Sequence, residues 1–273
     1  MYNKGIVAYL YETHLHTAEA SRCSVSGGAD YIAGYIEKGY SGIIVTDHFF
    51  NGNCSLSRRL PWEEWVNRFC LGYENAKKEG DRRGLDVFFG WEETFDGCDD
   101  YLVYGLDKQW LLKHPEVRNW TRGEMYRVVR EEGGCVVQAH PFRQRYYISR
   151  VILSTGCVDA VEAVNGGHDD EAFDVLANRY AQAIGKPVIA GTDIHDASFI
   201  YSKKLFGIYS KNKLNGIEDF VNLILNNNIA GIKTDGRLNY NGYETVGIPV
   251  EIRDKYDRIT SSNWKENFKE YVF

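Results

Sequence analysis

Two pairs of candidate metal ligands in this sequence, His14 with His16 and Asp193 with His195, have members separated by a single residue. In an extended segment, side chains two residues apart point to the same side with their Cα atoms about 6 to 7 Å apart, so both can reach one ion. Imidazole and carboxylate together suit zinc, manganese or iron, whereas carboxylates alone favour magnesium or calcium. Each pair is therefore a candidate part of a transition-metal site.

More side chains of these types follow other apolar runs, and five of the seven histidines in the chain lie at such positions. An isolated His-x-His is more often a pair of ordinary surface or core histidines, but coincidence does not explain five separated positions. The predicted ligands are His14, His16, His48, Glu92, His140, Asp193 and His195. Because one tetrahedral ion needs fewer ligands, the set predicts a multinuclear site in which a carboxylate such as Glu92 bridges two metals. For His114 and His168 we expect surface loops.

The elements that must position these residues form a regular alternation. Short apolar, β-branched runs are followed by helical patterns, which indicates βα units and a mostly parallel sheet. We expect strands at residues 6–12, 41–46, 86–91, 101–106, 135–138, 160–165 and 188–191. We expect helices at residues 29–38, 62–79, 121–131 and 171–184. Several of them close on a glycine, as helix C-termini often do: Gly39, Gly80, Gly133 and Gly185.

Seven such strands without a Pro/Gly/Ser-rich linker favour one closed or nearly closed (β/α) barrel, with a doubly wound open sheet as the alternative. In α/β barrels the active site lies at the C-terminal ends of the strands, which is where the candidate ligands follow the apolar runs. We expect the barrel to occupy residues 1–210. Residues 211–273 are expected to form a helix, at 217–225, and a polar tail packed on the same domain.

The bulk composition excludes several classes of protein. With 44% apolar and 26% charged residues among 273, the chain is globular and long enough for a substantial core. A net charge of −6 without any Lys/Arg-rich run argues against a nucleic-acid groove. The six cysteines form no CxxC pair, and neither a signal peptide nor a membrane span is recognisable. We therefore predict a cytoplasmic protein with reduced thiols.

In order and spacing, the segments ETHLHT (12–17), GIIVTDH (42–48), GWE (90–92), QAHP (138–141) and GTDIH (191–195) resemble the successive motifs of the PHP (polymerase and histidinol phosphatase) family. The resemblance implies an α/β fold, a distorted (β/α)7 TIM-like barrel in a single domain. It also implies two or three divalent transition-metal ions (Zn, Mn or Fe) at the mouth of the barrel, and phosphoesterase activity. The fold and the metals carry over more safely than the substrate.

Carried over residue by residue, the resemblance implies three metal positions: His14, His16, Glu92 and Asp193 at the first, Glu92 and His140 at the second, and His48 and His195 at the third. Two places depart from the family pattern. Ser21 and Arg22 stand where members commonly have an acid or a histidine, and residues 100–104 contain no histidine where the fourth strand often carries one. Glu19 and Asp47 are candidates for a missing oxygen ligand.

A multimetal site indicates hydrolysis, because bound metals lower the pKa of water, orient it and neutralise developing charge. Arg143, three residues after His140, and Arg22, on the first loop, are candidates to bind phosphate oxygens through the planar guanidinium group. Asp47 completes the candidate catalytic set. The expected substrate is a small phosphorylated metabolite. Two alternatives stay open: an amidohydrolase-like enzyme acting on a C–N or ester bond, and a non-catalytic metal-binding PHP module.

Overall fold

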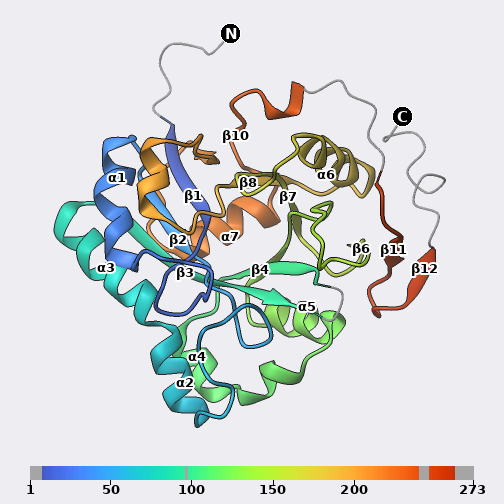
Figure 1. Ribbon diagram of the computed structural model, residues 1–273, viewed down its shortest axis with the longest axis horizontal. Helices are drawn as coiled ribbons and strands as arrows, with labels where there is room; N and C mark the ends of the chain where they lie inside the picture. Colours follow the sequence, from blue (N-terminus) through green and yellow to red (C-terminus); the bar gives the residue numbers. More distant parts are fainter. Residues whose placement is uncertain (1–7, 96–97, 240–245, 262–273) are drawn as a thin grey trace.

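The computed structural model describes residues 8–95, 98–239 and 246–261 (Figure 1). Seven strands form a ring: β1 (Tyr9–Leu15), β2 (Gly42–Val45), β3 (Asp86–Thr94), β4 (Asp100–Tyr104), β5 (Cys135–Ala139), β7 (Ala160–Asn165) and β8 (Val188–Gly191). The ring approaches closure where the chain after β8 meets β1: Asp193 donates its N–H to the His14 carbonyl (2.8 Å), and His16 donates to the Ile194 carbonyl (3.0 Å). The result is a mixed α/β fold with a nearly closed, barrel-like sheet.

All seven expected strands are present, with boundaries that differ by up to three residues. Two further strands extend the ring beyond β1, namely β9 (Gly207–Ser210) and β10 (Gly231–Lys233). The nine strands follow the order β10-β9-β1-β2-β3-β4-β5-β7-β8. Residues 6 and 7 of the first expected strand lie outside the described residues.

Strand β4 departs from the expected parallel arrangement. It runs antiparallel to both β3 and β5, whereas β1, β2 and β3 are mutually parallel, as are β5, β7 and β8. Five residues separate Thr94 from Asp100, and a parallel crossover needs a dozen or more. Because β4 is reversed, Asp100 at its start lies at the same edge of the sheet as the C-terminal ends of β3 and β5.

The helices lie around the outside of the sheet (Figure 1). They are α1 (Tyr31–Glu37), α2 (Trp62–Phe69), α3 (Leu71–Arg83), α4 (Lys108–Lys113), α5 (Arg122–Glu131), α6 (Ala172–Ala183) and α7 (Ile217–Leu225). Short 3-10 helices occur at Gly28–Asp30, Pro115–Asn119, Ala197–Tyr201 and Arg237–Asn239. The helix expected at 217–225 is α7, whereas the helix expected at 62–79 is divided into α2 and α3.

The expectation that a helix ends at Gly80 was wrong, because α3 continues to Arg83 and ends before Gly84, which has φ 85°. A Cβ atom on Gly80 would lie 2.6 Å from the Val87 side chain and 2.7 Å from the Leu85 carbonyl oxygen. Gly80 therefore lets the helix approach β3 closely. The other three expected glycines, Gly39, Gly133 and Gly185, do have positive φ angles at helix ends.

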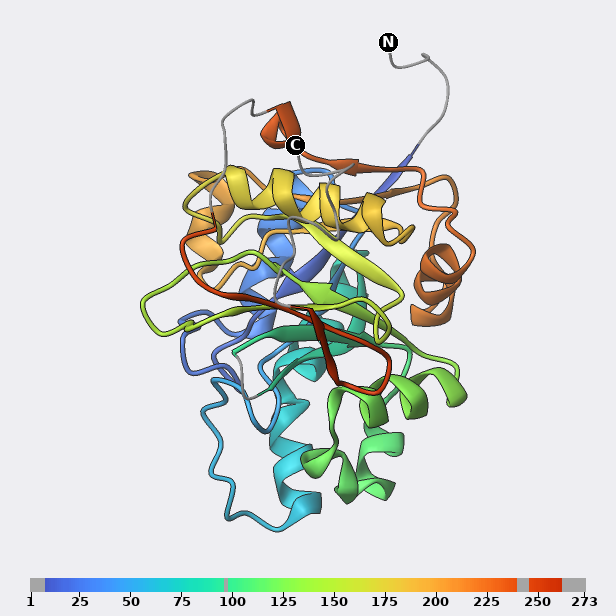
Figure 2. The same cartoon turned by 90° about the vertical axis from the view of Figure 1, so that its right-hand side faces the viewer.

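A small second sheet involves the C-terminal part of the chain. Strand β6 (Val151–Ser154) pairs in parallel with β11 (Val250–Arg253), which pairs in turn with β12 (Ile259–Ser261). Figure 2 shows β11 and β12, in dark red, running across the flank of the molecule. The described part of residues 211–273 thus pairs with strands from earlier in the chain, and the division at residue 210 stays a prediction.

The buried acid Glu12 holds the C-terminal end of β1 against the segment that follows β8. The Glu12 carboxylate accepts the backbone N–H groups of Thr13 (3.0 Å), His14 (3.0 Å) and Thr192 (2.8 Å), and also the hydroxyl of Tyr35 (2.8 Å). Glu12 is fully buried, so it needs these donors to offset its desolvation. The network holds the backbone around His14 against the backbone that precedes Asp193.

A buried aromatic cluster supports the strand ends on the other side of the mouth. The Phe49 ring centroid lies 5.1 Å from that of Trp65 and 5.3 Å from that of Trp91, and all three side chains are fully buried. Such ring pairs contribute about 0.5–1.5 kcal/mol each beyond their burial. Phe49 follows His48 and Trp91 precedes Glu92, so the cluster fixes the backbone beside two predicted ligands.

Candidate metal centre

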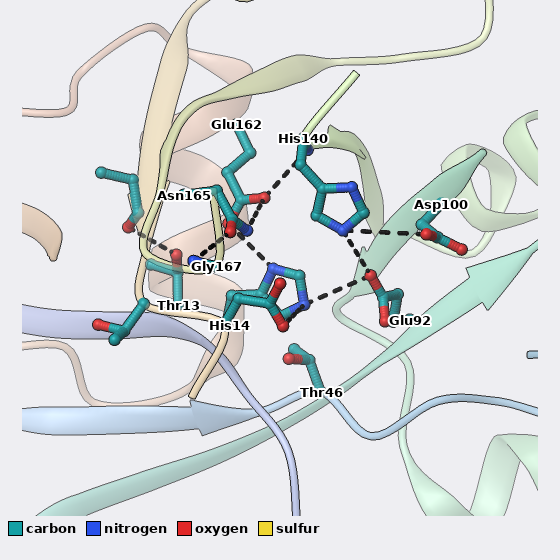
Figure 3. Close-up of polar contacts among 12 residues, drawn as sticks. Thr13, His14, Thr46, Glu92, Asp100, His140, Glu162, Asn165 and Gly167 are labelled. Atoms are coloured by element: carbon teal, nitrogen blue, oxygen red, sulfur yellow. Dashed lines mark hydrogen bonds and ion pairs between the residues drawn. The ribbon is translucent and has the colours of Figure 1, made fainter. Parts of the chain in front are cut away.

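The seven predicted ligands come together at one mouth of the barrel. They are carried by the ends of β1, β2, β3, β5 and β8, and all are buried except His48 and His195, which are partly exposed. Figure 3 shows His14, Glu92 and His140 turned toward one another, with Asp100 beside them. The strand-end rule used with the sequence therefore identified a real convergence of side chains.

Four side chains form the innermost group. The Nε2 atoms of His14 and His16 are 3.0 Å apart, and Asp193 Oδ1 lies 3.5 and 3.1 Å from them, respectively. Glu92 Oε1 lies 3.4 Å from His14 Nε2. Ligand atoms that share one transition-metal ion at about 2.0–2.2 Å stand roughly 3 to 3.5 Å apart. The group has the separations expected of a common coordination shell.

The two oxygens of Glu92 face different sets of histidines. Oε1 lies 3.0 Å from His140 Nε2, while Oε2 lies 2.6 Å from His48 Nδ1 and 3.5 Å from His16 Nε2. Oε2 and His48 Nδ1 are buried, and neither has a hydrogen-bond partner of good geometry among the described residues. A carboxylate oxygen and an imidazole nitrogen that are buried, close together and without hydrogen-bond partners are suitable ligands for one cation. Glu92 is thus placed as a bridging carboxylate would be.

The electrostatics of the group favour the anionic form of its acids. Burial alone would raise the pKa of Glu92, but the charges of His48 and His14 hold it well below its usual range. The same holds for Asp193, where burial is outweighed by His14 and Arg143. The carboxylates are therefore ready to bind cations at neutral pH.

Two of the predicted ligands have unusual backbone conformations. His140 has φ 29° and Asp193 has φ 52°, both in the left-handed region, which few residues other than glycine adopt and in which asparagine, aspartate and histidine are the more frequent exceptions. The strands end at these residues, and the backbone turn directs both side chains inward. The His140 N–H donates to Glu162 Oε2 (3.1 Å), which helps to hold the turn.

Glu162 is a supporting residue that sequence reasoning missed. It lies inside β7 and is fully buried. Its Oε1 is 2.9 Å from Nδ1 of His14, so the imidazole is held with Nε2 directed at the other ligands. Asn165 Nδ2 donates to the second oxygen (2.9 Å). The available signal was a single acid in the otherwise apolar segment AVEAVN.

Asp47 lies behind the ligands and does not join them. Its carboxylate accepts the N–H and the hydroxyl of Thr17 and the hydroxyl of Ser21, each at 2.6 Å. Ser21 Oγ is also 3.1 Å from Nδ1 of His16. Burial raises the pKa of Asp47 to about 6 in spite of these hydrogen bonds. Asp47 is placed to orient His16 through Ser21.

Glu19, the other candidate for a missing oxygen ligand, is turned away from the mouth. Its carboxylate accepts the Gly28 N–H (3.2 Å) and the Asn75 side-chain amide (2.9 Å).

The two predicted phosphate-binding arginines are in different places. Arg143 lines the cavity at the mouth, and its Nη2 donates to Asp193 Oδ2 (2.5 Å) and to Asn165 Oδ1 (2.7 Å). Its Nε is buried without a hydrogen-bond partner among the described residues. Arg22 is exposed, donates to the Cys54 carbonyl (3.3 Å) and does not line the cavity. The structure brings Arg143 to the site and leaves Arg22 outside it.

Asp100 is an acid at the mouth that the sequence did not identify as a ligand. One ligand atom each from Glu92, Asp100 and His140 lie within 4.8 Å of one another. Burial and the nearby charge of Glu92 raise the pKa of the Asp100 carboxyl to about 8. Asp100 lies on the strand where the family pattern has a histidine, and it reaches the mouth because β4 is reversed.

The prediction that His168 lies on the surface was wrong. The side chain is fully buried, and Nδ1 is 2.7 Å from Asp174 Oδ1. Burial lowers the pKa of His168, so a neutral imidazole hydrogen-bonded to Asp174 supports the barrel wall here.

A cavity of about 620 Å³ opens in front of the ligands, which is the size of many small-molecule sites. Besides His48, Asp193 and His195, its wall includes polar, cationic and aromatic side chains. Among them are Asn51, Thr94, Arg143, Tyr147, Phe199 and Lys203.

Comparison with known proteins finds similarity in structure alone. No protein-family model matches the chain. No curated protein matches it either. A two-domain protein from Bacteroides vulgatus that contains a predicted PHP-like metal-dependent phosphoesterase superposes with a TM-score of 0.55 at 13% identity, over 85% of this chain and 66% of that one. PsfC from Pseudomonas syringae superposes with a TM-score of 0.54 at 15% identity, over 85% of this chain and 94% of that one.

At these identities the likeness shows the fold alone, a mixed α/β fold with a nearly closed, barrel-like sheet that is consistent with a TIM-like barrel. This chain spans 66% of the length of the Bacteroides structure. Among the described residues, no helix is long and apolar enough to cross a membrane.

Proposed function

We propose that this chain is a metal-dependent hydrolase of the PHP type that cleaves phosphoesters, on a distorted (β/α)7 barrel. The observation that carries the proposal is the position of Glu92, a buried residue. One of its carboxylate oxygens faces the imidazole of His140 and the other faces the imidazole of His48. One carboxylate between two nitrogen sets is the arrangement of a site with at least two ions.

The residues present fit two or three divalent transition-metal ions (Zn, Mn or Fe). His14, His16, Glu92 and Asp193 would hold one ion. Glu92, Asp100 and His140 would hold a second, and His48 and His195 would contribute to a third. When bound, the ions supply an activated water and neutralise charge on the substrate oxygens.

The protein's own contribution is orientation. Glu162 fixes the ring of His14, and Asp47 acts on His16 through Ser21, so that both imidazoles present Nε2 to the centre. Asp193 and Asn165 hold the guanidinium of Arg143 at the cavity wall. Arg143 uses Nη2 for these contacts, which leaves Nη1 to bind a phosphate oxygen.

The cavity fits a small phosphorylated metabolite. Its volume of about 620 Å³ is that of a metabolite site, and Arg143, Arg145 and Lys203 all contribute cationic groups to its wall. The same activated water would serve a C–N or ester substrate, but the guanidinium beside the centre favours phosphate.

The test is elemental analysis of protein purified without added metal, combined with assays on phosphomonoesters, phosphodiesters, carboxylic esters and amides. We expect at least two transition-metal ions per chain and turnover confined to phosphoesters. One ion or none under non-chelating conditions would overturn the multinuclear site. Turnover of amides alone would replace phosphoester chemistry with the amidohydrolase-like alternative, and metal binding without any turnover would support a non-catalytic module.

A further inference from the structure

The two arginines of the cavity wall are both hydrogen-bonded to the turn that follows β7, which we call the 165–168 turn. Arg143 Nη2 donates to Asn165 Oδ1 (2.7 Å), and Arg145 Nη2 donates to the Gly167 carbonyl (2.8 Å). The turn therefore helps to determine where both guanidinium groups lie.

The 165–168 turn also fits closely against Arg143. The Gly167 N–H donates to Asn165 Oδ1 (2.7 Å), the same oxygen that accepts from Arg143, while Asn165 Nδ2 donates to Glu162 (2.9 Å) (Figure 3). A Cβ atom on Gly167 would lie 2.9 Å from Arg143 Nη2. Because the contact is this tight, a shift of the turn would move the guanidinium of Arg143.

A buried carboxylate holds the turn from the side away from the cavity. Asp174, in the first turn of α6, is fully buried. Its Oδ1 accepts the Asn165 N–H (3.0 Å) and is 2.7 Å from Nδ1 of His168, so both ends of the turn are fastened to one side chain. A buried carboxylate needs a compensating charge. Arg237 supplies it, since its Nη1 donates to Asp174 Oδ2 (2.8 Å).

Arg237 belongs to the C-terminal part of the chain, where it begins the short 3-10 helix Arg237–Asn239. The same Nη1 also donates to the Asn165 carbonyl (3.2 Å), and the guanidinium lies 5.0 Å from the centre of the Phe206 ring. Arg237 is not among the residues of the cavity wall that the structure describes. Its contacts lead to the turn, and the substrate would not touch it.

We propose that Arg237 is a positioning residue for phosphate binding. Through Asp174 it fixes the 165–168 turn, and the turn holds Arg143 and Arg145 at the cavity wall. The inference rests on the proposed function, because it assigns a further residue to the same site. Orientation of a guanidinium matters since its planar fork must meet the phosphate oxygens, and a misplacement of about 1 Å can reduce a rate on the order of 100-fold.

The variant Arg237→Gln tests the proposal. A neutral amide leaves Asp174 without its counter-charge, so the turn should loosen. We expect the Kd for inorganic phosphate to rise about tenfold and kcat/KM on a phosphomonoester to fall about tenfold. Metal content should not change, because Glu162 keeps its contacts with His14 and with the His140 N–H.

Arg253→Gln is the matched control. Arg253 also lies in the C-terminal part and is 13% exposed, against 12% for Arg237. It pairs with Glu251 (3.0 Å) and Asp257 (3.2 Å), and the described cavity wall includes neither of them. Loss of a half-buried ion pair should lower Tm in both variants. Only Arg237→Gln should change the two phosphate constants.

A double-mutant cycle separates positioning from a general weakening of the fold. If Arg237 acts through the two arginines, Arg237→Gln should change kcat/KM by less than about twofold when Arg143 and Arg145 are already alanine. A further tenfold loss in that background would overturn the proposal. So would wild-type phosphate constants in Arg237→Gln, or equal losses in Arg253→Gln.

Arg237→Lys serves if the glutamine variant does not fold. It keeps the charge beside Asp174, but the ammonium ends one bond short of the guanidinium nitrogens and lacks the fork, so Kd for phosphate should rise at least about threefold. An unchanged Kd would contradict the inference. Wild-type protein that neither binds phosphate nor cleaves phosphoesters would refute the proposed function together with it. Wild-type turnover combined with unaffected Arg237 variants would refute the positioning role alone.

Discussion

The two sides of the candidate centre present different donor atoms. On one side, which we call the imidazole end, His16, His48 and His195 come from the ends of the parallel strands β1, β2 and β8. On the other, the oxygen end, Glu92 and Asp100 flank a single histidine, His140. Imidazoles suit zinc, whereas an oxygen-rich set suits manganese and magnesium better. One mouth therefore presents two donor sets, and under the proposed function their metal preferences would differ.

The difference has its origin in strand direction. The imidazole end receives its side chains from residues that follow parallel strands, as the (β/α) pattern leads one to expect. The oxygen end contains Asp100 because β4 is reversed and brings its first residue to the mouth. Glu92 belongs to both ends, since it faces His140 with one oxygen and His48 with the other.

Replacing the shared residue should give the largest effect. In Glu92→Gln a neutral amide, a poor bridge between two cations, replaces the carboxylate. We expect metal content and activity to fall together, by more than the roughly 10- to 100-fold that loss of a supporting residue costs. Elemental analysis and kcat/KM on a phosphomonoester measure the two losses.

Glu93→Gln is the matched control for this variant. Glu93 is buried on the same strand, and burial raises its pKa to about 8, so it is mostly neutral at pH 7 and an amide imitates it. The control should keep its metals. Full activity in Glu92→Gln, with loss in Glu93→Gln, would show that the bridge was misplaced and that the two ends are not joined through Glu92.

Arg143 should affect the substrate and neither end of the metal centre. Arg143→Ala removes a charge-assisted contact of about 1.5–3 kcal/mol, so we expect kcat/KM on a phosphomonoester to fall about 10- to 100-fold at unchanged metal content. Lysine should restore only part of the loss, because it lacks the planar fork. If the Ala variant loses its metals instead, Arg143 acts by holding Asp193.

Asp100 tests the oxygen end alone. In Asp100→Asn we expect manganese to bind about tenfold more weakly there, because Glu92 and His140 remain, while zinc at the imidazole end is unaffected. Asp100→His should instead shift the preference of this end toward zinc. Titrations with manganese and zinc check both variants. If Asp100→Asn weakened manganese binding and zinc binding equally, the two ends would not be separate sites.

The smallest effect is expected from Ser21→Ala, which tests the imidazole end. Its hydroxyl connects Asp47 to Nδ1 of His16. Without it His16 is less well oriented, and zinc affinity should fall by less than about tenfold. Isothermal titration with zinc measures the change. If only manganese binding were weakened, the assignment of Ser21 to the imidazole end would be contradicted.

The strands and the ligand side chains could be predicted because the signal is local. Five of the seven apolar runs are followed directly by a candidate ligand, as at His48 and His140, and an α/β barrel brings such ends together. The reversal of β4 was missed although even the predicted connection, residues 92–100, is shorter than the dozen residues that a parallel crossover needs. With the true boundaries, the five-residue connection would have indicated a hairpin.

The supporting contacts depend on tertiary structure that no local pattern encodes. Glu162 is 148 residues from His14 in the chain, and β6 pairs with β11 nearly a hundred residues later. Arg22 and Cys23 are neighbours on one loop, yet one points to solvent and the other into the cavity. The Arg22 N–H donates to the Asn53 carbonyl, and the Ser24 hydroxyl donates to the His195 carbonyl. These contacts fix the loop, and they form only in the folded chain.

The left-handed backbone conformations of His140 and Asp193 reduce the stability of the fold at two positions of the candidate metal centre. Each costs on the order of 1 kcal/mol relative to an ordinary backbone, and asparagine or glycine would relieve part of that cost. Substitutions that stabilise the fold are therefore available at two positions whose side chains face the centre. Under the proposed function, relieving that cost would remove a metal ligand, so stability and metal binding oppose each other at these two positions.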